Sequence, residues 1–407
     1  MPNPPLFLGR ARDLSTYLPT SCGLAVLGLL WLSSQVGFSQ VGKGPETQPR
    51  AAALVTTKGR TTATYAKGFT IVYVGQCKVV TIRNPFEQTT TATRYLLVPR
   101  GAARPAGYAD AQVIVTPIRS LVGLSSMHVA LASFLGADDV LVGLGDLKYA
   151  SAPRVRQRIA EGKIYAVGQG KELNNEQLVA AHPDLVMVTG WPGENMTRFR
   201  TLAAAGVPVM INSEWVETTP LARAEWVKVL AALLNKEDLV NQKFDQVARE
   251  YERLAALGRK ATPRPRVVLG LPFKDVWHVP DTDSYLAQFL RDAGTTYAWD
   301  QTKAPQGSLA LSFETVAPVA LTADYWLCNS AARTKADVLA QDARYAAFAP
   351  FQSGRLYNNN LRTNAAGAND YWESGAVRPD LVLADLLRIF HPGLLPAGPL
   401  HYHQRLK

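Results

Sequence analysis

The stretch that decides the fold is NEQLVAAHPDLVMV, residues 175–188, because the chain repeats its pattern in FETVAPVALTADYWL, residues 313–327. Each stretch opens as a short helix with a Glu in its first turn. It then passes through a turn that contains an Asp and ends in an apolar run typical of a buried strand. Each also follows a helix-like segment that ends in Gly, residues 126–136 and 284–294. This duplication predicts two similar α/β lobes, an architecture that can hold a ligand in the cleft between them.

Strand-like and helix-like segments alternate along most of the chain. In the first half, helix-like segments begin at Ser126, Glu176 and Thr197. The strand-like runs between them cover residues 112–115, 140–143, 185–188 and 207–211. The alternation resumes at residue 267 and continues to about residue 390. Such alternation predicts parallel sheets with helices on both faces.

Two features lie outside this alternation. Residues 69–74 and 78–82 alternate in polarity on either side of a short turn, which predicts a β-hairpin, and residues 94–98 add a third strand. In the middle of the chain, a helix that begins at Lys236 carries apolar side chains at steps of four and three residues, the period of a helix with one buried face. At roughly 1.5 Å per residue this helix spans more than about 30 Å. It is predicted to be a stiff connector between the lobes.

The expected fold class is therefore α/β, with two Rossmann-like lobes of parallel sheet joined by one long α-helix, and a small β-hairpin region ahead of them. The predicted division of the chain is as follows: signal peptide 1–39, linker and hairpin extension 40–105, N-terminal lobe 106–235, interlobe helix 236–261, C-terminal lobe 262–392 and tail 393–407.

The N-terminal residues predict export. Arg10 and Arg12 precede an apolar run at residues 23–32, which is shorter than the roughly 20 residues of a membrane span. Small residues then stand before Gln40, as at a signal-peptidase site. An uncleaved anchor is the alternative interpretation. Cys22 precedes the apolar run and is therefore a poor site for a lipid anchor. The protein is expected to be periplasmic or otherwise exported, with membrane association left open.

Composition and motifs exclude several functions. The formal net charge is +10, but no block of Lys and Arg indicates nucleic-acid binding. Cys77 and Cys328 are expected to be two isolated thiols in different parts of the chain. The sequence has no phosphate-binding Gly-rich loop of the Walker type, no Gly-x-Ser-x-Gly motif and no paired-Cys zinc motif. Its six His residues are too dispersed for a site that binds a bare metal ion. The chain is therefore predicted not to be an enzyme and to hold no cofactor or directly bound metal.

Residues 110–392 resemble the substrate-binding proteins of ABC importers for ferric siderophores, haem and cobalamin. The resemblance is carried by residues 122–128, 175–188, 220–226, 284–294 and 369–373. The closing segments 379–385 and 390–392 are similar to an iron-type branch found in Bacteroidetes-like bacteria. The resemblance implies a monomer that captures a ferric siderophore or similar iron chelate between its lobes. It would deliver this ligand to an inner-membrane permease with its ATPase. A haem- or cobalamin-binding protein of the same fold is the alternative.

Candidate ligand contacts are aromatic, cationic and His side chains near predicted strand ends, helix starts or in the Asn-rich loop before residue 373. Parallel α/β lobes bind ligands at the carboxyl ends of their strands, and aromatic faces and Arg suit anionic chelates. The candidates are His128, Trp191, Trp215, Arg223, Trp277, His278, Tyr285, Arg362, Tyr371 and Trp372. Each His or Trp taken alone is more often a packing residue than a ligand contact, and Trp226 is expected to be core.

Glu176 and Glu314 occupy equivalent positions in the repeat. As carboxylates in the first turn of a helix, they could simply stabilise the helix dipole by about 0.3–1 kcal/mol. The resemblance implies instead that one acidic residue on each lobe pairs with arginines of the permease. The residues alone leave both interpretations open.

Overall fold

A computed structural model describes residues 59–85, 92–168, 170–190, 196–304 and 307–407. All of them belong to one compact unit, residues 56–407. The predicted signal peptide, its cleavage site and Cys22 lie outside the described residues. Among the residues described, no helix is both long enough and apolar enough to cross a membrane.

The unit begins with a small mixed sheet of strand order β1-β2-β3-β4, in which β3 and β4 are parallel and the other pairs antiparallel. Val74 pairs with Cys77, so the predicted hairpin and its two-residue turn are confirmed. The predicted boundary at residue 105 separates β4 from the sheet to which it belongs. The strands are β1 Phe69–Val74, β2 Cys77–Ile82, β3 Thr93–Pro99 and β4 Gln112–Thr116.

The N-lobe contains a five-stranded sheet that is parallel throughout, in the order β7-β6-β5-β8-β9. Its strands are β5 Leu121–Gly123, β6 Leu141–Leu144, β7 Tyr165–Ala166, β8 Leu185–Thr189 and β9 Val209–Asn212. Its helices are α1 Ser126–Phe134, α2 Pro153–Ala160, α3 Asn175–Ala181 and α4 Arg200–Ala204. Single 3-10 turns are η1 Asp138–Val140, η2 Leu147–Tyr149, η3 Gly170–Glu172, η4 Met196–Phe199 and η5 Glu214–Val216.

The C-lobe sheet has the order β12-β10-β14-β15-β16, and only β16 is antiparallel to its neighbour. Its strands are β10 Arg266–Leu269, β12 Thr296–Tyr297, β14 Tyr325–Leu327, β15 Leu356–Asn358 and β16 Gln404–Arg405. A separate antiparallel pair is formed by β11 Trp277–Pro280 and β13 Ser308–Leu311. The helices and 3-10 turns are α8 Tyr285–Asp292, α9 Phe313–Ala320, α10 Lys335–Leu339, η6 Ala343–Ala347, α11 Ala349–Gln352, η7 Asp370–Trp372 and α12 Ser374–Val377.

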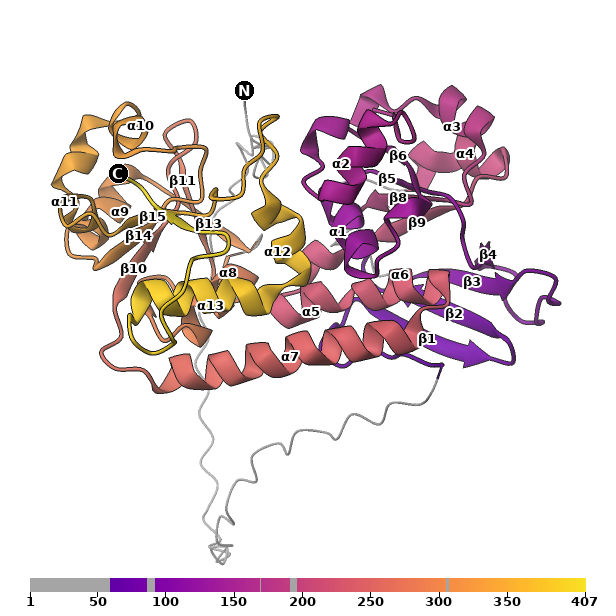
Figure 1. Cartoon of the computed structure of the whole chain (residues 1–407), viewed down its shortest axis with the longest axis horizontal. Helices are drawn as coiled ribbons and strands as arrows, with labels where there is room; N and C mark the ends of the chain where they lie inside the picture. Colours follow the sequence, from indigo (N-terminus) through magenta and orange to yellow (C-terminus); the bar gives the residue numbers. More distant parts are fainter. Residues whose placement is uncertain (1–58, 86–91, 169, 191–195, 305–306) are drawn as a thin grey trace, which may run out of the picture. The chain divides into compact units, whose positions relative to one another are not determined.

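A layer of helices connects the two lobes. It consists of α5 Pro220–Glu225, α6 Val227–Leu234, α7 Glu237–Lys260 and α13 Pro379–Phe390. Helix α7 packs against α6 on the N-lobe side and against α8 and α13 on the C-lobe side (Figure 1). Its predicted apolar face is confirmed, with Val240, Phe244, Tyr251 and Leu254 all buried. One continuous core runs from β1 through these helices to the C-lobe, and a second core lies between the N-lobe sheet and helices α3 and α4.

The predicted repeat is confirmed at the level of topology. In each lobe, the strand that ends the repeated stretch, β8 or β14, lies beside the first strand of the lobe, β5 or β10. The Asp of the repeat performs the same task in both lobes. Asp184 Oδ2 accepts a hydrogen bond from the Arg119 N–H at 2.6 Å, and Asp324 Oδ2 accepts one from the Arg266 N–H at 2.8 Å. Each Asp therefore fixes the chain where it enters the first strand of its lobe.

The segment that leads into β1 is held by two buried carboxylates. Glu225 accepts hydrogen bonds from the backbone N–H groups of residues 64, 65 and 66, at distances of 2.6–3.0 Å, and pairs with Lys228 Nζ at 2.7 Å. Glu217 accepts from the N–H groups of residues 67 and 68. Both carboxylates are buried, so this extended segment is bound to the helical layer through its backbone.

A buried lysine ties the hairpin to the start of α7. Lys78 Nζ on β2 donates to Ala232 O and to Asn235 Oδ1, each at 2.7 Å, and forms an ion pair with Glu237. The same ammonium group thus bonds a free carbonyl at the carboxyl end of α6 and neutralises a carboxylate in the first turn of α7. The N-terminal sheet is consequently an integral part of the connector.

The chain after α13 is not a tail. Strand β16 pairs with β15, and Tyr402, His403 and Leu406 are buried. Asp385 on α13 accepts hydrogen bonds from the N–H groups of residues 401, 402 and 403. The expectation of a separate tail at residues 393–407 is therefore wrong, because a two-residue strand carries too little pattern to be recognised. Cys77 and Cys328 are free thiols, as expected, and both are buried rather than half-buried.

We predict that Glu225→Ala lowers the free energy of unfolding by about 3–5 kcal/mol. The substitution leaves the buried Lys228 ammonium without a counter-charge and several backbone N–H groups without an acceptor. Guanidinium unfolding measures this change. The matched control is Glu250→Ala, which removes an exposed pair with Arg253 of the same i,i+3 spacing and length and should cost less than about 1 kcal/mol. Equal losses in the two variants would show that the buried carboxylate does not hold the segment.

Candidate functional site

Three predicted contact residues converge where the N-lobe passes into the helical layer beside the C-lobe. Arg223 on α5 places its guanidinium carbon 4.1 Å from the ring centre of Tyr285, in the first turn of α8. The Arg223 Nε atom is buried and has no hydrogen-bond partner. Tyr371 lies nearby on η7. Burial raises its pKa, which the neighbouring Tyr285 raises further and the charge of Arg223 lowers. The result is a cation stacked on a phenol ring at the junction of the two lobes.

Glu214 on η5 is the counter-charge of this arginine. Its Oε1 lies 3.9 Å from Arg223 Nη2, and its Oε2 accepts a 2.7 Å hydrogen bond from Asn212 Nδ2. Burial raises the pKa of Glu214 to about 7, although Arg223 acts to lower it. The charge balance around Arg223 therefore changes near neutral pH.

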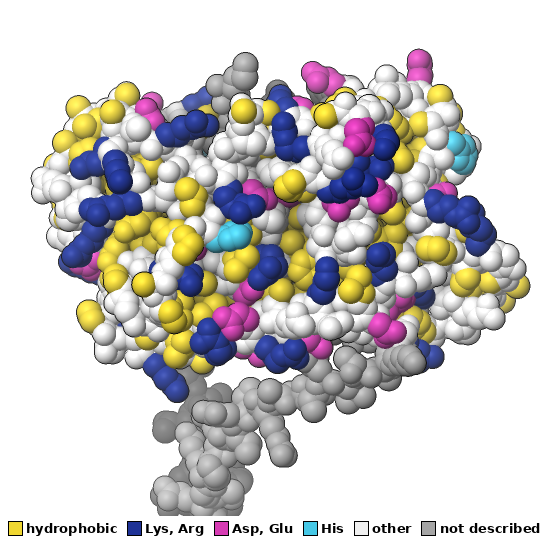
Figure 2. Space-filling model, viewed as in Figure 1, with side chains coloured by type: hydrophobic (Ala, Val, Ile, Leu, Met, Phe, Trp, Pro, Cys, Tyr) yellow, Lys and Arg dark blue, Asp and Glu magenta, His cyan; other side chains and the backbone are white. Residues whose placement is uncertain are grey.

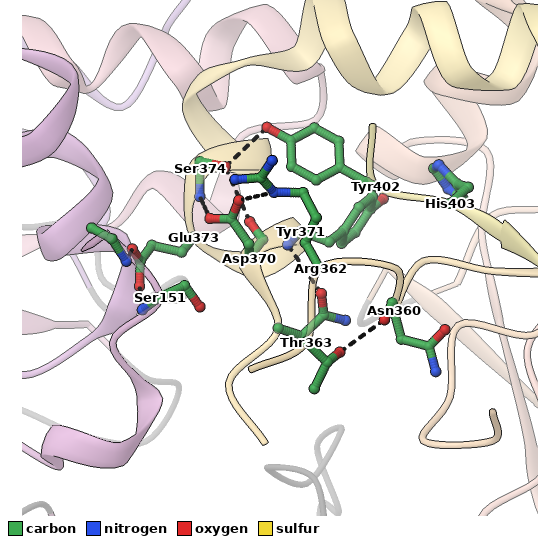
Figure 3. A network of polar contacts seen from close by, with 12 residues as sticks. Ser151, Asn360, Arg362, Thr363, Asp370, Tyr371, Glu373, Ser374, Tyr402 and His403 are labelled. Carbon is green, nitrogen blue, oxygen red and sulfur yellow. Dashed lines mark hydrogen bonds and ion pairs between the residues drawn. The ribbon is translucent and has the colours of Figure 1, made fainter. Parts of the chain in front are cut away.

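A second group of candidates lies on residues 360–374, which we call the strap (Figure 3). Arg362 Nε donates to Asp370 Oδ2 at 2.6 Å. Tyr371 is buried against Tyr402 and His403. Trp372, which meets the Tyr371 ring edge-on, is 46 % exposed and available for contact.

The strap also reaches the N-lobe. Glu373 accepts hydrogen bonds from the backbone N–H groups of Ser151 and Ala152. Burial raises the pKa of Glu373 to about 7. The sequence indicated neither Glu214 nor Glu373. The pKa of Glu214 is raised by burial, which the sequence does not reveal, and the partners of Glu373 lie in a distant part of the chain.

Two predicted contacts are fully buried in the structure. Trp277 is fully buried among Trp326, Tyr345 and Phe348, and its Nε1 donates to Leu269 O. It is a core residue, because the aromatic side chains of the C-lobe gather around β11. His128 is also fully buried on α1, which lowers its pKa to about 3, and neither of its ring nitrogens has a partner. In this arrangement neither side chain is accessible to a ligand.

The remaining tryptophans and His278 are placed differently. Trp215 is half-buried and donates from Nε1 to Gly190 O at 3.1 Å. His278 is half-buried on β11, opposite Ala310 of β13. Trp191 lies outside the described residues. Trp226 is fully buried, which confirms it as core.

Glu176 and Glu314 are both exposed in the first turn of their helices. Other side chains, Asn174 and Ser312, already cap these helices. The pKa of Glu314 is lowered chiefly by its own backbone N–H, then by Ser312, and Arg344 Nη1 lies 3.8 Å away. Each lobe thus presents a carboxylate to solvent at an equivalent place, which is compatible with both interpretations above.

The described residues enclose two hollows, of which the smaller is lined by the candidate Tyr371. A cavity of about 10 Å³, the size of one water molecule, is lined by Tyr371, His403, Asn329 and C-lobe apolar side chains. A larger hollow of about 270 Å³ lies between Tyr65, the start of α5, α7 and α8. Within the described ranges, no three His, Cys, Asp or Glu side chains cluster in a way that could hold a metal ion.

A model of the family described as "Periplasmic binding protein" matches residues 124–359, more than half of the chain. The chain belongs to the periplasmic binding protein family. Members of this family bind small ligands and work with the permease and ATPase components of ABC transporters. The chain is therefore a periplasmic binding protein of the type that serves ABC importers. It has the two α/β lobes that the sequence predicted.

One curated relative and two solved structures are similar to this chain. An uncharacterized lipoprotein of Methanocaldococcus jannaschii is 24% identical over 363 residues, which cover 83% of this chain and 84% of that protein. A possible iron-binding periplasmic solute-binding protein of Staphylococcus epidermidis has a TM-score of 0.52 at 15% identity, covering 68% of this chain and 100% of its own. The haem-binding protein RhuT of Roseiflexus has a TM-score of 0.52 at 19% identity, with the same two coverages. At these identities the structures establish the shared fold.

We predict that Glu214 makes stability depend on pH. Its folded pKa of about 7 exceeds the ordinary value of 4.5, so between these two pH values the folded protein keeps a proton that the unfolded chain has released. Stability must then fall as pH rises through this window. The fall attributable to Glu214 is about 3 kcal/mol at most.

The measurement is the free energy of unfolding of wild type and Glu214→Gln at about pH 5 and about pH 8. Wild type should lose more stability than the variant as pH rises, while Glu172→Gln, at an exposed carboxyl, should behave as wild type. An identical fall in wild type and Glu214→Gln would contradict the raised pKa.

Proposed function

We propose that this protein is the substrate-binding component of an ABC importer and that it captures a ferric siderophore or similar iron chelate between its lobes. It then delivers the chelate to an inner-membrane permease and its ATPase. The observation that carries the proposal is the Arg223 guanidinium, stacked on Tyr285 at the lobe junction with an unpartnered Nε. A planar cation beside aromatic rings attracts an anionic chelate that has aromatic groups of its own.

The proposed contact set follows from accessibility. It keeps the half-buried and exposed candidates and also Tyr371, which is buried but lines the small cavity beside His403. It omits Trp277 and His128, which are fully buried. It consists of Arg223, Tyr285, Tyr371, Trp372, Arg362, Trp215 and His278. Resemblance in fold to an iron-binding and a haem-binding protein supports a metal-containing ligand.

Haem or cobalamin is the second candidate ligand. The half-exposed phenol of Tyr285 favours haem, because a phenol oxygen can coordinate haem iron. The buried His128 is poorly placed for the same role. Visible spectroscopy separates the candidates, since phenolate or imidazole ligation changes the haem spectrum and an intact ferric siderophore keeps its own charge-transfer band.

We predict that Arg223→Gln weakens binding of an anionic ferric chelate at least about tenfold, because a charge-assisted contact is worth roughly 1.5–3 kcal/mol. Calorimetric titration with a ferric catecholate, a ferric hydroxamate, haemin and cyanocobalamin measures this loss and ranks the ligands. The matched control is Arg355→Gln, an exposed arginine over Tyr325 away from the junction. Binding of no chelate by the wild type, or equal effects of the two variants, would contradict the proposal.

Glu176 and Glu314 are proposed to dock the protein on the permease. Exposed carboxylates at a protein interface contribute to register and association rate through contacts with arginines. Reversing both charges in Glu176→Lys/Glu314→Lys should abolish uptake of a radioactively labelled iron chelate by cells, with ligand affinity unchanged. Glu161→Lys/Glu250→Lys, which reverses two other exposed carboxylates, should leave uptake intact. If the first double variant folds and loses ligand affinity, the docking role is wrong.

A further inference from the structure

One buried carboxylate of the C-lobe is bonded to the N-lobe. Glu373, between η7 and α12, accepts a hydrogen bond from the Ser151 N–H to Oε2 at 2.8 Å and one from the Ala152 N–H to Oε1 at 2.7 Å. The residue is only 2 % exposed. Figure 3 shows its side chain extending from the strap to the N-lobe helix that begins beyond Ser151. Both oxygens of the carboxylate are therefore used across the lobe junction.

This contact completes an N-lobe helix that lacks a cap of its own. Helix α2 begins at Pro153, and its N-cap residue, Ala152, has no side-chain oxygen to accept the free N–H groups. Glu373, from the other lobe, instead accepts from the N–H of the N-cap residue Ala152 and of Ser151 before it. Its carboxylate thus lies at the positive end of the helix dipole. The N-lobe is thus locally incomplete without the C-lobe.

A second bond joins the same two places. Asn364 of the strap donates from Nδ2 to Ala150 O at 3.1 Å. Its Oδ1 accepts from the N–H groups of Ala366 and Ala368, which fixes the amide. Two side chains of the strap, Glu373 and Asn364, therefore form hydrogen bonds with residues 150–152.

The strap is held firmly on the C-lobe. Asn360 donates from Nδ2 to Ala332 O at 2.8 Å and accepts at Oδ1 from Gln404 Nε2 at 2.7 Å. At the other end of the strap, the hydroxyls of Ser374 and Tyr402 are 3.0 Å apart. Helix α12, which continues from the strap, packs against α1 of the N-lobe. Movement of the N-lobe away from the C-lobe must therefore break the bonds of Glu373 and Asn364, because the strap cannot follow it.

We propose that Glu373 is a latch that keeps the two lobes together, and that its release allows them to separate about α7. Within the described part of the chain, no Lys or Arg pairs with this carboxylate, and the carboxylates of Asp370 and Asp138 disfavour its charge. A charge held in a buried site by two N–H groups alone gains solvation when the lobes part. This distinguishes a releasable latch from a permanent ion pair such as Glu225 with Lys228.

The test measures the distance between the lobes without any ligand, so its outcome is independent of the proposed function. Spin labels are placed at Ala180→Cys on α3 and Gln341→Cys after α10, both exposed, in the full chain with Cys22→Ser. Cys77 and Cys328 are buried and should not react. Pulsed electron paramagnetic resonance of this protein should give one narrow distribution of the distance between the two spin labels.

Glu373→Ala should broaden that distribution and shift it to longer distances. The control, Glu161→Ala, removes an exposed carboxylate at the opposite end of α2 and should change nothing. Asn364→Ala, which removes a cross-lobe bond without uncovering a charge, should broaden it less, and it provides the test if Glu373→Ala fails to fold. Hydrogen exchange at Ser151 and Ala152 should quicken in Glu373→Ala. Faster exchange there with an unchanged distance would show that Glu373 is only a helix cap, and would overturn the latch.

Discussion

The single buried face of α7 is the constraint on which the rest of the structure depends. Tyr251 and Leu254 on this face belong to the same continuous core as β1 of the N-terminal sheet and the C-lobe strands. A helix packed along its length cannot bend without uncovering apolar side chains, each worth about 1.5–3 kcal/mol when fully buried. Any separation of the lobes is therefore limited by the stiff connector, whether or not Glu373 also holds them together.

Several buried carboxylates form hydrogen bonds and ion pairs around this connector. Their partners explain their different roles. Glu225 has a lysine and several N–H groups, so it fixes the N-terminal segment permanently. Glu214 and Glu373 are buried with a distant cation or none, and burial raises the pKa of each to about 7. Both lie where the lobes meet. The molecule therefore combines a rigid connector with groups at the junction whose charge state can change.

The sequence predicted the features of the fold that depend on neighbouring residues within one element. The steps of four and three residues in α7, the two-residue turn after Val74 and the repeated Glu-to-Asp stretch each act within one element, and the structure confirms them. Arg223 was selected because it follows a predicted strand and Tyr285 because it begins a predicted helix, and the structure stacks the two side chains. Trp277 was misplaced since position after a strand does not reveal which face a side chain takes. Glu373 was missed because its partners lie 222 and 221 residues earlier in the chain.

Native mass spectrometry of the protein purified from its own iron-limited cells tests the central claim most directly, since it weighs the intact complex and identifies what is bound. The account predicts one small organic molecule and one iron atom per chain, released together on unfolding. A protein that emerges with no small molecule, or with a ligand that contains no metal, would contradict it.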